Sequence, residues 1–442
     1  MPGLEVQRYL EGLGRFGIHM GLSRVRRLME ELGNPHLAYR TIHVTGTNGK
    51  GSVCRMLACI LESAGYRTGL YLSPHLERFN ERISINGRNI PDASLERAVR
   101  KVRPIVDAMA EKGHQCTYFE ATTAMAFEHF RRAKVDIAVI EVGLGGRLDA
   151  TNVIEPIVSV ITNVSLEHTE HLGATVERVA AEKAGIIKPG APVVTAAWDR
   201  AALGVIERVA RKNRSPFHLM QREVRRRPLG WDLHGQRFDI YTDNGQYRGL
   251  FTPMLGRFQL TNAALAVLTA ELLSGAGLRV TEKSIARGIR RAWLPGRMEL
   301  IEGKPSLLLD CAHNPGAAAE AAGEVARIKE RGGFGKVHLL FGIMKDKDLK
   351  GVLGPFLRSA DTLTYTEFPS ERSRPVESAR SEVVAIAAKA GVREVSFSKR
   401  PTEALDAVLG RAEKGELVWC AGSMYLIGEL RGELRRRGLV GG

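Results

Sequence analysis

Residues 41–52 read Thr41-Ile-His-Val-Thr-Gly46-Thr-Asn-Gly-Lys50-Gly-Ser52, an apolar segment that runs into a glycine-rich turn. The apolar segment predicts a short buried strand, and the following residues predict a helix whose apolar side is formed by Val53, Leu57, Ile60 and Leu61. Glycines let backbone N–H groups converge on phosphate oxygens, and a helix N-terminus adds the positive end of its dipole. The stretch therefore predicts a phosphate-binding loop between the first strand of an α/β unit and its helix.

This loop departs from the common phosphate-loop pattern G-x-x-x-x-G-K-[ST], because it is shorter and Gly51 separates Lys50 from Ser52. Lys50 can contact the terminal phosphates of a nucleotide as a point charge, and Ser52 can offer its hydroxyl to Mg²⁺. A plain turn is the alternative, since Gly-Lys-Gly also occurs by chance. The strand before the loop and the helix after it favour a nucleotide site, with contacts from Gly46, Thr47, Asn48, Gly49, Lys50, Gly51 and Ser52.

The composition is that of an ordinary globular protein. Of the 442 residues, 44% are hydrophobic and 26% are charged, which excludes collagen, coiled coils and disordered chains and predicts two or three domains. The longest stretch without a charged residue, 258–270, is too short to cross a membrane. The N-terminus lacks the pattern of a secretory signal, and the five cysteines are scattered without a C-x-x-C pair. We expect a cytoplasmic protein without a membrane partner.

The charge balance is strongly basic, with 64 Lys and Arg against 49 Asp and Glu and a formal net charge of +15. Such an excess favours anionic partners, either nucleic acid or small polyanions such as nucleotides. The basic residues form short clusters, at 24–27, 222–227 and 435–437, without interleaved aromatic residues. Solvated surface is therefore favoured over a nucleic-acid groove, and no nucleic-acid partner is expected.

The rest of the chain alternates apolar runs with helical patterns, which predicts a mainly parallel sheet covered on both faces. Strands are expected at 68–72, 137–142, 158–161 and 192–195, and a helix at 175–184. A small antiparallel sheet is expected near 231–251, around Asp243-Asn-Gly245. The run Trp293-Leu-Pro-Gly-Arg297 is the candidate linker. After it, strands are expected at 306–309, 337–343, 362–368, 395–397 and 417–420, with helices at 317–329, 377–389 and 402–413.

Several further motifs follow the loop along the chain: YLSPHLERFNERI (71–83), TYFEATTAMAF (117–127), EVGLGGRLDATN (141–152), EKAGIIKPG (182–190), LPGRME (294–299), LDCAHNP (309–315) and AGSMYLIGE (421–429). Together with VTGTNGKGS, this ordered set resembles the folylpolyglutamate synthase and dihydrofolate synthase family, ATP-dependent amide ligases related to the Mur cell-wall ligases. The resemblance covers nearly the whole chain. It implies a Mur-ligase-like, P-loop-containing domain at 1–296, followed by a smaller Rossmann-like α/β domain at 297–442.

The resemblance also implies the reaction. L-Glutamate is expected to be joined to dihydropteroate, to the glutamate tail of reduced folates, or to both, through an acyl phosphate, with ADP and phosphate as the other products. A carboxylate is a poor electrophile, which is the physical reason that ATP is needed. The family pattern implies a monomer.

Metal ligands and a modified lysine follow from the same resemblance. One Mg²⁺ is expected on Ser73 and Glu141, with Ser52 nearby, and a second on His168, which is preferred over His171 because it follows Glu167. Taken alone, Ser73 would be a turn residue and Glu141 a charge at a strand end. Lys183 matches the lysine that is carbamylated in this family; the alternative is an unmodified lysine that bridges acidic groups.

The remaining expected contacts lie outside the loop. ATP is expected to be held also by Asn262, Arg297 and Asp310, and His313 is expected to orient the incoming glutamate. In isolation, Asn262 would be a helix cap, Arg297 a solvated side chain, and Asp310 the cap of a helix beginning near Pro315. The pterin surface is expected at the loop 18–22 and the segment 122–123, through Gly21, Leu22, Arg24, Thr122 and Thr123, although His19 replaces a usual acidic residue and a plain helix start is the alternative.

Three rival functions stay open at this point. A Mur cell-wall ligase would carry a UDP-sugar-binding domain before the loop, whereas only 45 residues precede Gly46. A basic nucleic-acid-dependent ATPase would hydrolyse ATP faster with DNA or RNA. A catalytically inactive interaction module is disfavoured because no motif residue is missing.

Overall fold

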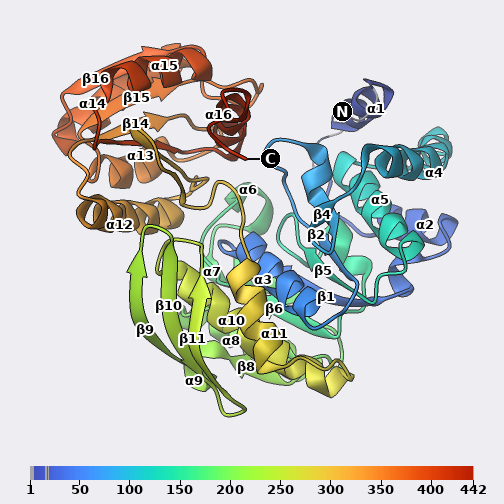
Figure 1. Cartoon of the computed structure of the whole chain (residues 1–442). Coiled ribbons are helices and arrows are strands. Elements are labelled where there is room, and N and C mark those ends of the chain that lie inside the picture. Colours follow the sequence, from blue (N-terminus) through green and yellow to red (C-terminus); the bar gives the residue numbers. More distant parts are fainter. Residues whose placement is uncertain (1–3, 15–16, 18, 442) are drawn as a thin grey trace. The chain divides into compact units, whose positions relative to one another are not determined.

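Two parallel sheets organise the chain in the computed structural model, which describes residues 4–14, 17 and 19–441 (Figure 1). The chain divides into two units. The first contains the residues up to Leu229, Phe238–Phe251 and Leu260–Trp293, and the second contains Gly230–Arg237, Thr252–Gln259 and the residues from Leu294 onward. The main division lies between Trp293 and Leu294, and the boundary expected between residues 296 and 297 stays a prediction.

The first unit contains an eight-stranded sheet in the order β4-β3-β2-β5-β1-β6-β7-β8. The strands from β2 to β8 in this order run parallel, and β3 and β4 form an antiparallel edge. Their bounds are β1 Arg40–Thr45, β2 Thr68–Tyr71, β3 Ile83–Ile85, β4 Arg88–Asn89, β5 Ile137–Glu141, β6 Val158–Ile161, β7 Val193–Thr195 and β8 Phe217–Leu219. The central strands are buried along their length, as expected when helices cover both faces.

The helices of this unit fall largely where the apolar periodicity places them. They are α1 Leu4–Gly14, α2 Ser23–Glu31, α3 Lys50–Ser63, α4 Asp92–Glu111, α5 Tyr118–Arg132, α6 Thr169–Leu172, α7 Val176–Ala184, α8 Arg200–Lys212, α9 Met220–Glu223, α10 Phe258–Leu272 and α11 Glu282–Arg291. Short 3₁₀ turns lie at Pro35–Leu37, Phe79–Arg82, Ala150–Val153 and Leu273–Ala276.

Helix α3 corrects one expectation, because it is buried on more than one side. Cys54, Met56 and Ala58 are fully buried along with the predicted apolar residues. Helix α11 packs closely on α3: a Cβ added to Gly288 would lie 2.4 Å from the Cα of Ile60. Helix α3 is therefore covered by α11, and the helix that follows the loop is rigidly packed.

An antiparallel three-stranded sheet, in the order β11-β10-β9, forms where it was expected. Its strands are β9 Arg225–Asp232, β10 Gly235–Tyr241 and β11 Gln246–Thr252. It begins earlier than predicted because β9 is a largely exposed, charged strand that lacks the alternating apolar signal.

The second unit contains a six-stranded sheet in the order β12-β13-β17-β14-β15-β16, in which only the β12–β13 pair is antiparallel. The strands are β12 Glu299–Ile301, β13 Ser306–Leu309, β14 Val337–Phe341, β15 Thr362–Thr366, β16 Glu394–Ser398 and β17 Leu417–Ala421. The helices are α12 Pro315–Gly332, α13 Leu349–Leu357, α14 Val376–Ala390, α15 Pro401–Arg411 and α16 Met424–Arg436. All five strands and three helices expected here are present; α13, α16 and β12 were not predicted.

Within the residues that the structure describes, no helix combines the length and the apolar character needed to cross a membrane.

A buried ion pair stabilises the second unit. The Arg431 Nε lies 3.0 Å from both carboxylate oxygens of Glu299, and the Gly296 N–H donates to the same carboxylate over 2.8 Å. Both side chains are at most 7% exposed. Glu299 therefore fixes the turn that precedes β12, where Arg297 lies.

Replacing Arg431 by methionine should destabilise this unit by about 3–5 kcal/mol, because a buried carboxylate is left without its counter-ion. Urea unfolding followed by circular dichroism measures this loss. Arg436→Met is the matched control, since Arg436 lies on the same helix in an exposed pair with Glu433 and should change stability little. Equal effects of the two variants would contradict the assigned role.

Candidate active site

The glycine-rich loop lies at the carboxyl end of β1, between the ends of β5 and β6. Strand β1 pairs in parallel with both neighbours, so the segments that follow all three strands meet at one edge of the sheet. Ligands bind at this edge in open parallel sheets. Helix α3 begins within the loop 46–52, at Lys50, with Gly49 as its N-cap.

Two loop glycines are required by the backbone and by close neighbours. Gly46 has φ +147°, and an added Cβ would lie 1.8 Å from the Thr162 Oγ1. Gly49 has φ +83°, and an added Cβ would lie 2.6 Å from the Asn262 Oδ1. A side chain at either position would therefore displace the loop or the polar residues that support it.

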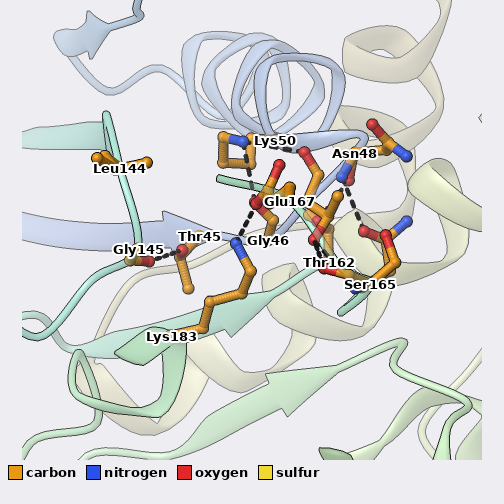
Figure 2. A network of polar contacts seen from close by, with 12 residues as sticks. Thr45, Gly46, Asn48, Lys50, Leu144, Gly145, Thr162, Ser165, Glu167 and Lys183 are labelled. Atoms are coloured by element: carbon orange, nitrogen blue, oxygen red, sulfur yellow. Dashed lines mark hydrogen bonds and ion pairs between the residues drawn. The ribbon is translucent and has the colours of Figure 1, made fainter. Parts of the chain in front are cut away.

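The segment after β6 holds the loop in place through a set of short hydrogen bonds (Figure 2). The Thr162 hydroxyl donates to the Asn48 carbonyl over 2.6 Å, and the Asn163 side chain accepts the Asn48 N–H over 2.8 Å. Thr47 and Ser165 exchange two bonds, each of 3.1 Å. The loop is thus fixed by residues that lie more than 100 positions away in the sequence.

The Lys50 side chain forms hydrogen bonds within the loop. Its Nζ donates to the Gly46 carbonyl over 2.9 Å and to the Thr47 carbonyl over 3.0 Å (Figure 2). The ammonium therefore lies at the N-terminus of α3, beside the backbone N–H groups that begin the helix. Positive charge from the side chain and from the helix end is concentrated at the same point.

Two of the expected metal ligands meet at the neighbouring strand end. Glu141 is the last residue of β5 and is 4% exposed, and its Oε2 accepts the Ser73 backbone N–H over 2.8 Å. Ser52 lies in the first turn of α3 and is also buried. Both Glu141 and Ser52 offer hard oxygen atoms, which suit Mg²⁺.

Lys183 and Glu167 form a buried pair beside the loop. The Lys183 Nζ lies 2.5 Å from the Glu167 Oε1, and the lysine side chain is 1% exposed (Figure 2). Burial lowers the pKa of Lys183 to about 8, although Glu167 opposes this decrease and Lys50 adds to it. Burial opposes ionisation of Glu167, but Lys183 and Lys50 outweigh it and hold the pKa of the carboxyl at about 2.

A small pocket joins these groups. It is lined by Thr45, Gly46, Lys50, Val142, Gly143, Leu144, Gly145, Glu167 and His168. His168 has a left-handed backbone, with φ +46°, whereas His171 is exposed on α6 and does not line the pocket. Across the described part of the chain, no three or more His, Cys, Asp or Glu residues cluster closely enough to form a metal site by themselves. A metal here would need hydroxyl and phosphate oxygens as well.

The residues expected on the pterin surface lie around the first turn of α2 and in α5. The Arg24 Nε lies 3.1 Å from Glu120, and its Nη2 donates to the His19 carbonyl. Gly21 donates its N–H weakly to the Leu148 carbonyl over 3.4 Å, and Leu22 is the N-cap residue of α2. The bond to Leu148 places Gly21 beside the EVGLGGRLDATN loop. Ile18, which belongs to the expected loop, lies outside the described residues.

Thr122 and Thr123 are fully buried within α5. Both hydroxyls lie 3.2–3.3 Å from the Tyr71 hydroxyl. In this arrangement their hydroxyls are bonded within the protein, so substrate binding by these two residues stays a prediction.

The second unit carries the other expected contacts. Asp310 directly follows β13 and is buried, and its two oxygens accept the N–H groups of Met298 and Ala312. Burial raises the pKa of this carboxyl, and Arg297 acts against that rise. The His313 Nδ1 lies 2.8 Å from the Cys311 carbonyl. The structure thus brings Arg297 and Asp310 together.

Two alternative roles considered from the sequence are wrong. Asn262 does not cap a helix, because it lies one turn inside α10 with its side chain against Gly49. Asp310 does not cap α12, because Asn314 does so by accepting the Ala317 N–H. The nucleotide contacts expected of these two residues stay predictions.

Two family models match the chain: the Mur ligase middle domain at residues 44–270, and the Mur ligase glutamate ligase domain at residues 296–424. The dihydrofolate synthase/folylpolyglutamate synthase of Bacillus subtilis is 33% identical over 434 residues, which cover 98% of this chain and 99% of the relative. The chain belongs to the dihydrofolate synthase/folylpolyglutamate synthase family. The family predicted from the sequence is confirmed.

Solved structures of this family share the fold. A Mycobacterium tuberculosis folylpolyglutamate synthase complexed with ADP has a TM-score of 0.89 and 31% identity, with 97% of each chain covered. Escherichia coli FolC in complex with DHPP and ADP has a TM-score of 0.86 and 29% identity, with 98% of each chain covered. The predicted fold class, a P-loop-containing α/β domain followed by a smaller Rossmann-like domain, is confirmed. The roles of the individual site residues stay predictions.

Three residues of this family site were missed by sequence reasoning: Thr162, Asn163 and Ser165. They follow directly after β6 and support the loop from the neighbouring strand. Polar residues that follow a buried run, as in Ile161-Thr-Asn-Val-Ser165, were the available signal. Using it required the sheet order, which the sequence does not state.

Proposed function

We propose that this protein is an ATP-dependent ligase that joins L-glutamate to dihydropteroate, or to the glutamate tail of reduced folates, through an acyl phosphate. The observation that carries the proposal is the loop 46–52, with Lys50, Glu141 and the Glu167–Lys183 pair gathered at one sheet edge. The similarity to the Bacillus subtilis enzyme over nearly the whole chain supports the same activity here. The ADP in the Mycobacterium tuberculosis structure supports ATP as the nucleotide.

The loop would bind the phosphates of ATP. Backbone N–H groups at the start of α3 and the Lys50 ammonium would face the phosphate oxygens, and Lys50 would exchange its bonds to the Gly46 and Thr47 carbonyls for phosphate. Asn262, next to Gly49, would add an amide contact from α10. These fixed charges would stabilise the negative charge that develops as the phosphoryl group moves.

The donor set fits Mg²⁺ held by few protein oxygens and by phosphate. Ser73, Glu141 and Ser52 would hold one ion, and His168 with a modified Lys183 would hold a second. Bound Mg²⁺ neutralises phosphate charge and polarises the γ-phosphoryl group. The chain's own contribution is the geometry at the end of β5, where the Ser73 N–H fixes the orientation of Glu141.

In the first step, an oxygen of the acceptor carboxylate attacks the γ-phosphorus, and the bond to the β-phosphate oxygen breaks to release ADP. In the second step, the glutamate amine attacks the acyl carbon, and inorganic phosphate leaves with the oxygen that came from the acid. Arg297 would contact phosphate, Asp310 would contact the nucleotide, and His313 would orient the glutamate. Exclusion of water protects the acyl phosphate from hydrolysis.

The lowered pKa of Lys183 supports its carbamylation. Because burial lowers the pKa of Lys183 to about 8, a larger share of these amines is neutral near pH 7.5 than in an ordinary lysine, whose pKa is about 10.4. The neutral nitrogen attacks the carbon of CO₂ and loses one proton, which gives a carbamate anion. A carbamate beside the Glu167 carboxylate needs a cation, and this need links the modification to the second Mg²⁺.

Protein incubated with ¹³C-bicarbonate should show one carbamate carbon resonance that is absent from Lys183→Arg. Removal of bicarbonate should lower the ligase activity of the wild type, because the second cation then lacks a ligand. Lys188→Arg is the matched control, since Lys188 is a half-buried lysine bonded to the Asn152 carbonyl. A resonance that persists in Lys183→Arg would contradict the assignment.

The proposed function is tested by ADP release from purified protein with ATP, Mg²⁺ and glutamate, comparing dihydropteroate with tetrahydrofolate as acceptor. At least one acceptor should trigger ADP release that requires glutamate. Stimulation by DNA or RNA instead would favour a nucleic-acid-dependent ATPase. We further propose that the protein acts in the cytoplasm, as its free cysteines suggest, and as a monomer, as the family pattern implies.

A further inference from the structure

A second pocket in the first unit lies apart from the loop 46–52. Its volume is about 630 Å³, which is within the range of small-molecule sites. Its walls come from the β3–β4 hairpin, from α4 and from the end of α5; β4, α4 and α5 are labelled in Figure 1. Apolar side chains, among them Ile85, Ile90 and Ala98, form part of its lining.

The polar lining of this pocket is strongly basic. Against one carboxylate, that of Glu128, it contains six cationic side chains: Arg67, Arg88, Arg97, Lys101, Arg131 and Arg132. All six are exposed. Glu128 is paired with Arg131 through two bonds of 2.8–2.9 Å. In the described part of the chain, the other five cations have no ion pair with a carboxylate, and Arg97 donates only to the Ser94 hydroxyl.

His129 also lines this pocket, and the neighbouring positive charges affect its pKa. Burial, together with the smaller effects of Arg97, Arg132 and Arg67, lowers the pKa of His129 to about 4. The imidazole is therefore neutral at physiological pH, so that one ring nitrogen can donate and the other can accept a hydrogen bond. Five unpaired cations held near one another repel, and this repulsion is relieved when an anion binds between them.

The pocket is distinct from the proposed active site. Arg67 precedes β2, Arg132 lies just before β5, and the tip of the β3–β4 hairpin lies beside the start of β2. These are the amino ends of the parallel strands, whereas the loop 46–52 lies at the carboxyl ends. At about 3.3 Å per residue, the length of β5 places roughly 15 Å between the two edges.

We propose that this pocket binds a small polyanion, one that carries several clustered phosphate or carboxylate oxygens. Arginine guanidinium groups form paired hydrogen bonds to both kinds of oxyanion. A single-stranded nucleic acid is disfavoured, because the lining contains no Phe, Tyr or Trp on which bases could stack. The limited volume of the pocket, about 630 Å³, also favours a small ligand over an extended one. This proposal does not depend on the proposed ligase activity.

Calorimetric titration of the full chain tests the proposed anion binding. Two probes are used: tripolyphosphate carries clustered phosphate oxygens, and penta-γ-glutamate carries clustered carboxylate oxygens. Each titration is run with saturating ADP, and again in a Lys50→Ala variant, so that binding at the loop 46–52 is excluded. At least one probe should bind with one site per chain in both conditions. The probe that binds shows whether the pocket prefers phosphate or carboxylate oxygens. If neither binds, the proposal is wrong.

Arg97→Glu and Arg100→Glu form a matched pair, because both residues are exposed on α4 but only Arg97 lines the pocket. Arg97→Glu should weaken probe binding about tenfold or more, since an attractive contact with the anion in the pocket is replaced by repulsion. Arg100→Glu should change it less than about twofold, because exposed charges are screened over a Debye length. Equal losses in the two variants would overturn the proposal in favour of diffuse surface charge. Much tighter binding of a single-stranded RNA would overturn it in favour of a nucleic-acid surface.

Discussion

Replacing Lys50 by alanine should lower the rate of glutamate-dependent ADP release by about 10²–10³-fold, because a fixed positive charge at the transferred phosphoryl group is lost. The Lys50 ammonium lies at the N-terminus of α3, where its charge and the helix dipole act on the same point. Steady-state kinetics with the preferred acceptor measures this change. The loss should appear mainly in kcat, since the charge matters most in the transition state.

Lys50→Arg is the matched variant for this prediction. It keeps the positive charge, but a guanidinium cannot reproduce the two bonds that Nζ makes to the Gly46 and Thr47 carbonyls. Activity between that of the wild type and Lys50→Ala is expected. Unchanged kcat in Lys50→Ala, with a folded circular dichroism spectrum, would show that the loop does not act on the reacting phosphate.

Replacing Gly46 by alanine should weaken ADP binding about 100-fold, because a backbone strain of about 1–3 kcal/mol and a steric clash would displace the loop that is proposed to bind the phosphates. The new Cβ would lie 1.8 Å from the Thr162 Oγ1, which now donates to the Asn48 carbonyl. The backbone at φ +147° also disfavours any residue other than glycine. Titration with ADP measures the affinity.

Gly204→Ala is the control for this substitution. Gly204 is exposed in the middle of α8, and no atom lies within 4 Å of an added Cβ. Alanine there should leave ADP binding unchanged and raise stability slightly, by up to about 1 kcal/mol. If both glycine variants bind ADP like the wild type, then the loop is not the nucleotide site.

The strands and helices of both units could be predicted from the sequence because the apolar runs are short and end at glycine, proline or polar residues. The order of the strands within each sheet could not be predicted from the sequence. Strand β5 lies between β1 and β2 in the sheet, although it follows both in the sequence. A parallel connection passes over a neighbouring strand, and the sequence does not say which one. The supports that Thr162 and Asn163 give to the loop depend on this order.

The candidate site was readable where its residues are contiguous, as in the loop 46–52. It was less readable where function depends on distant packing. Nothing local indicates that Asn262 lies against Gly49, or that Lys183 and Glu167 form a buried pair. The same limit applies to Thr122 and Thr123, whose burial under Tyr71 is a property of the tertiary structure. The resemblance to a known family supplied these positions, and physical reasoning from the sequence alone did not.

Transfer of ¹⁸O tests the central claim most directly. Dihydropteroate or a folate with ¹⁸O in its reacting carboxylate is converted with ATP and glutamate, and the released inorganic phosphate is analysed by mass spectrometry. An acyl phosphate requires that one labelled oxygen leave with the phosphate for each amide bond formed. Phosphate without label, produced at the same rate as the amide, would contradict carboxylate activation by the nucleotide bound at residues 46–52.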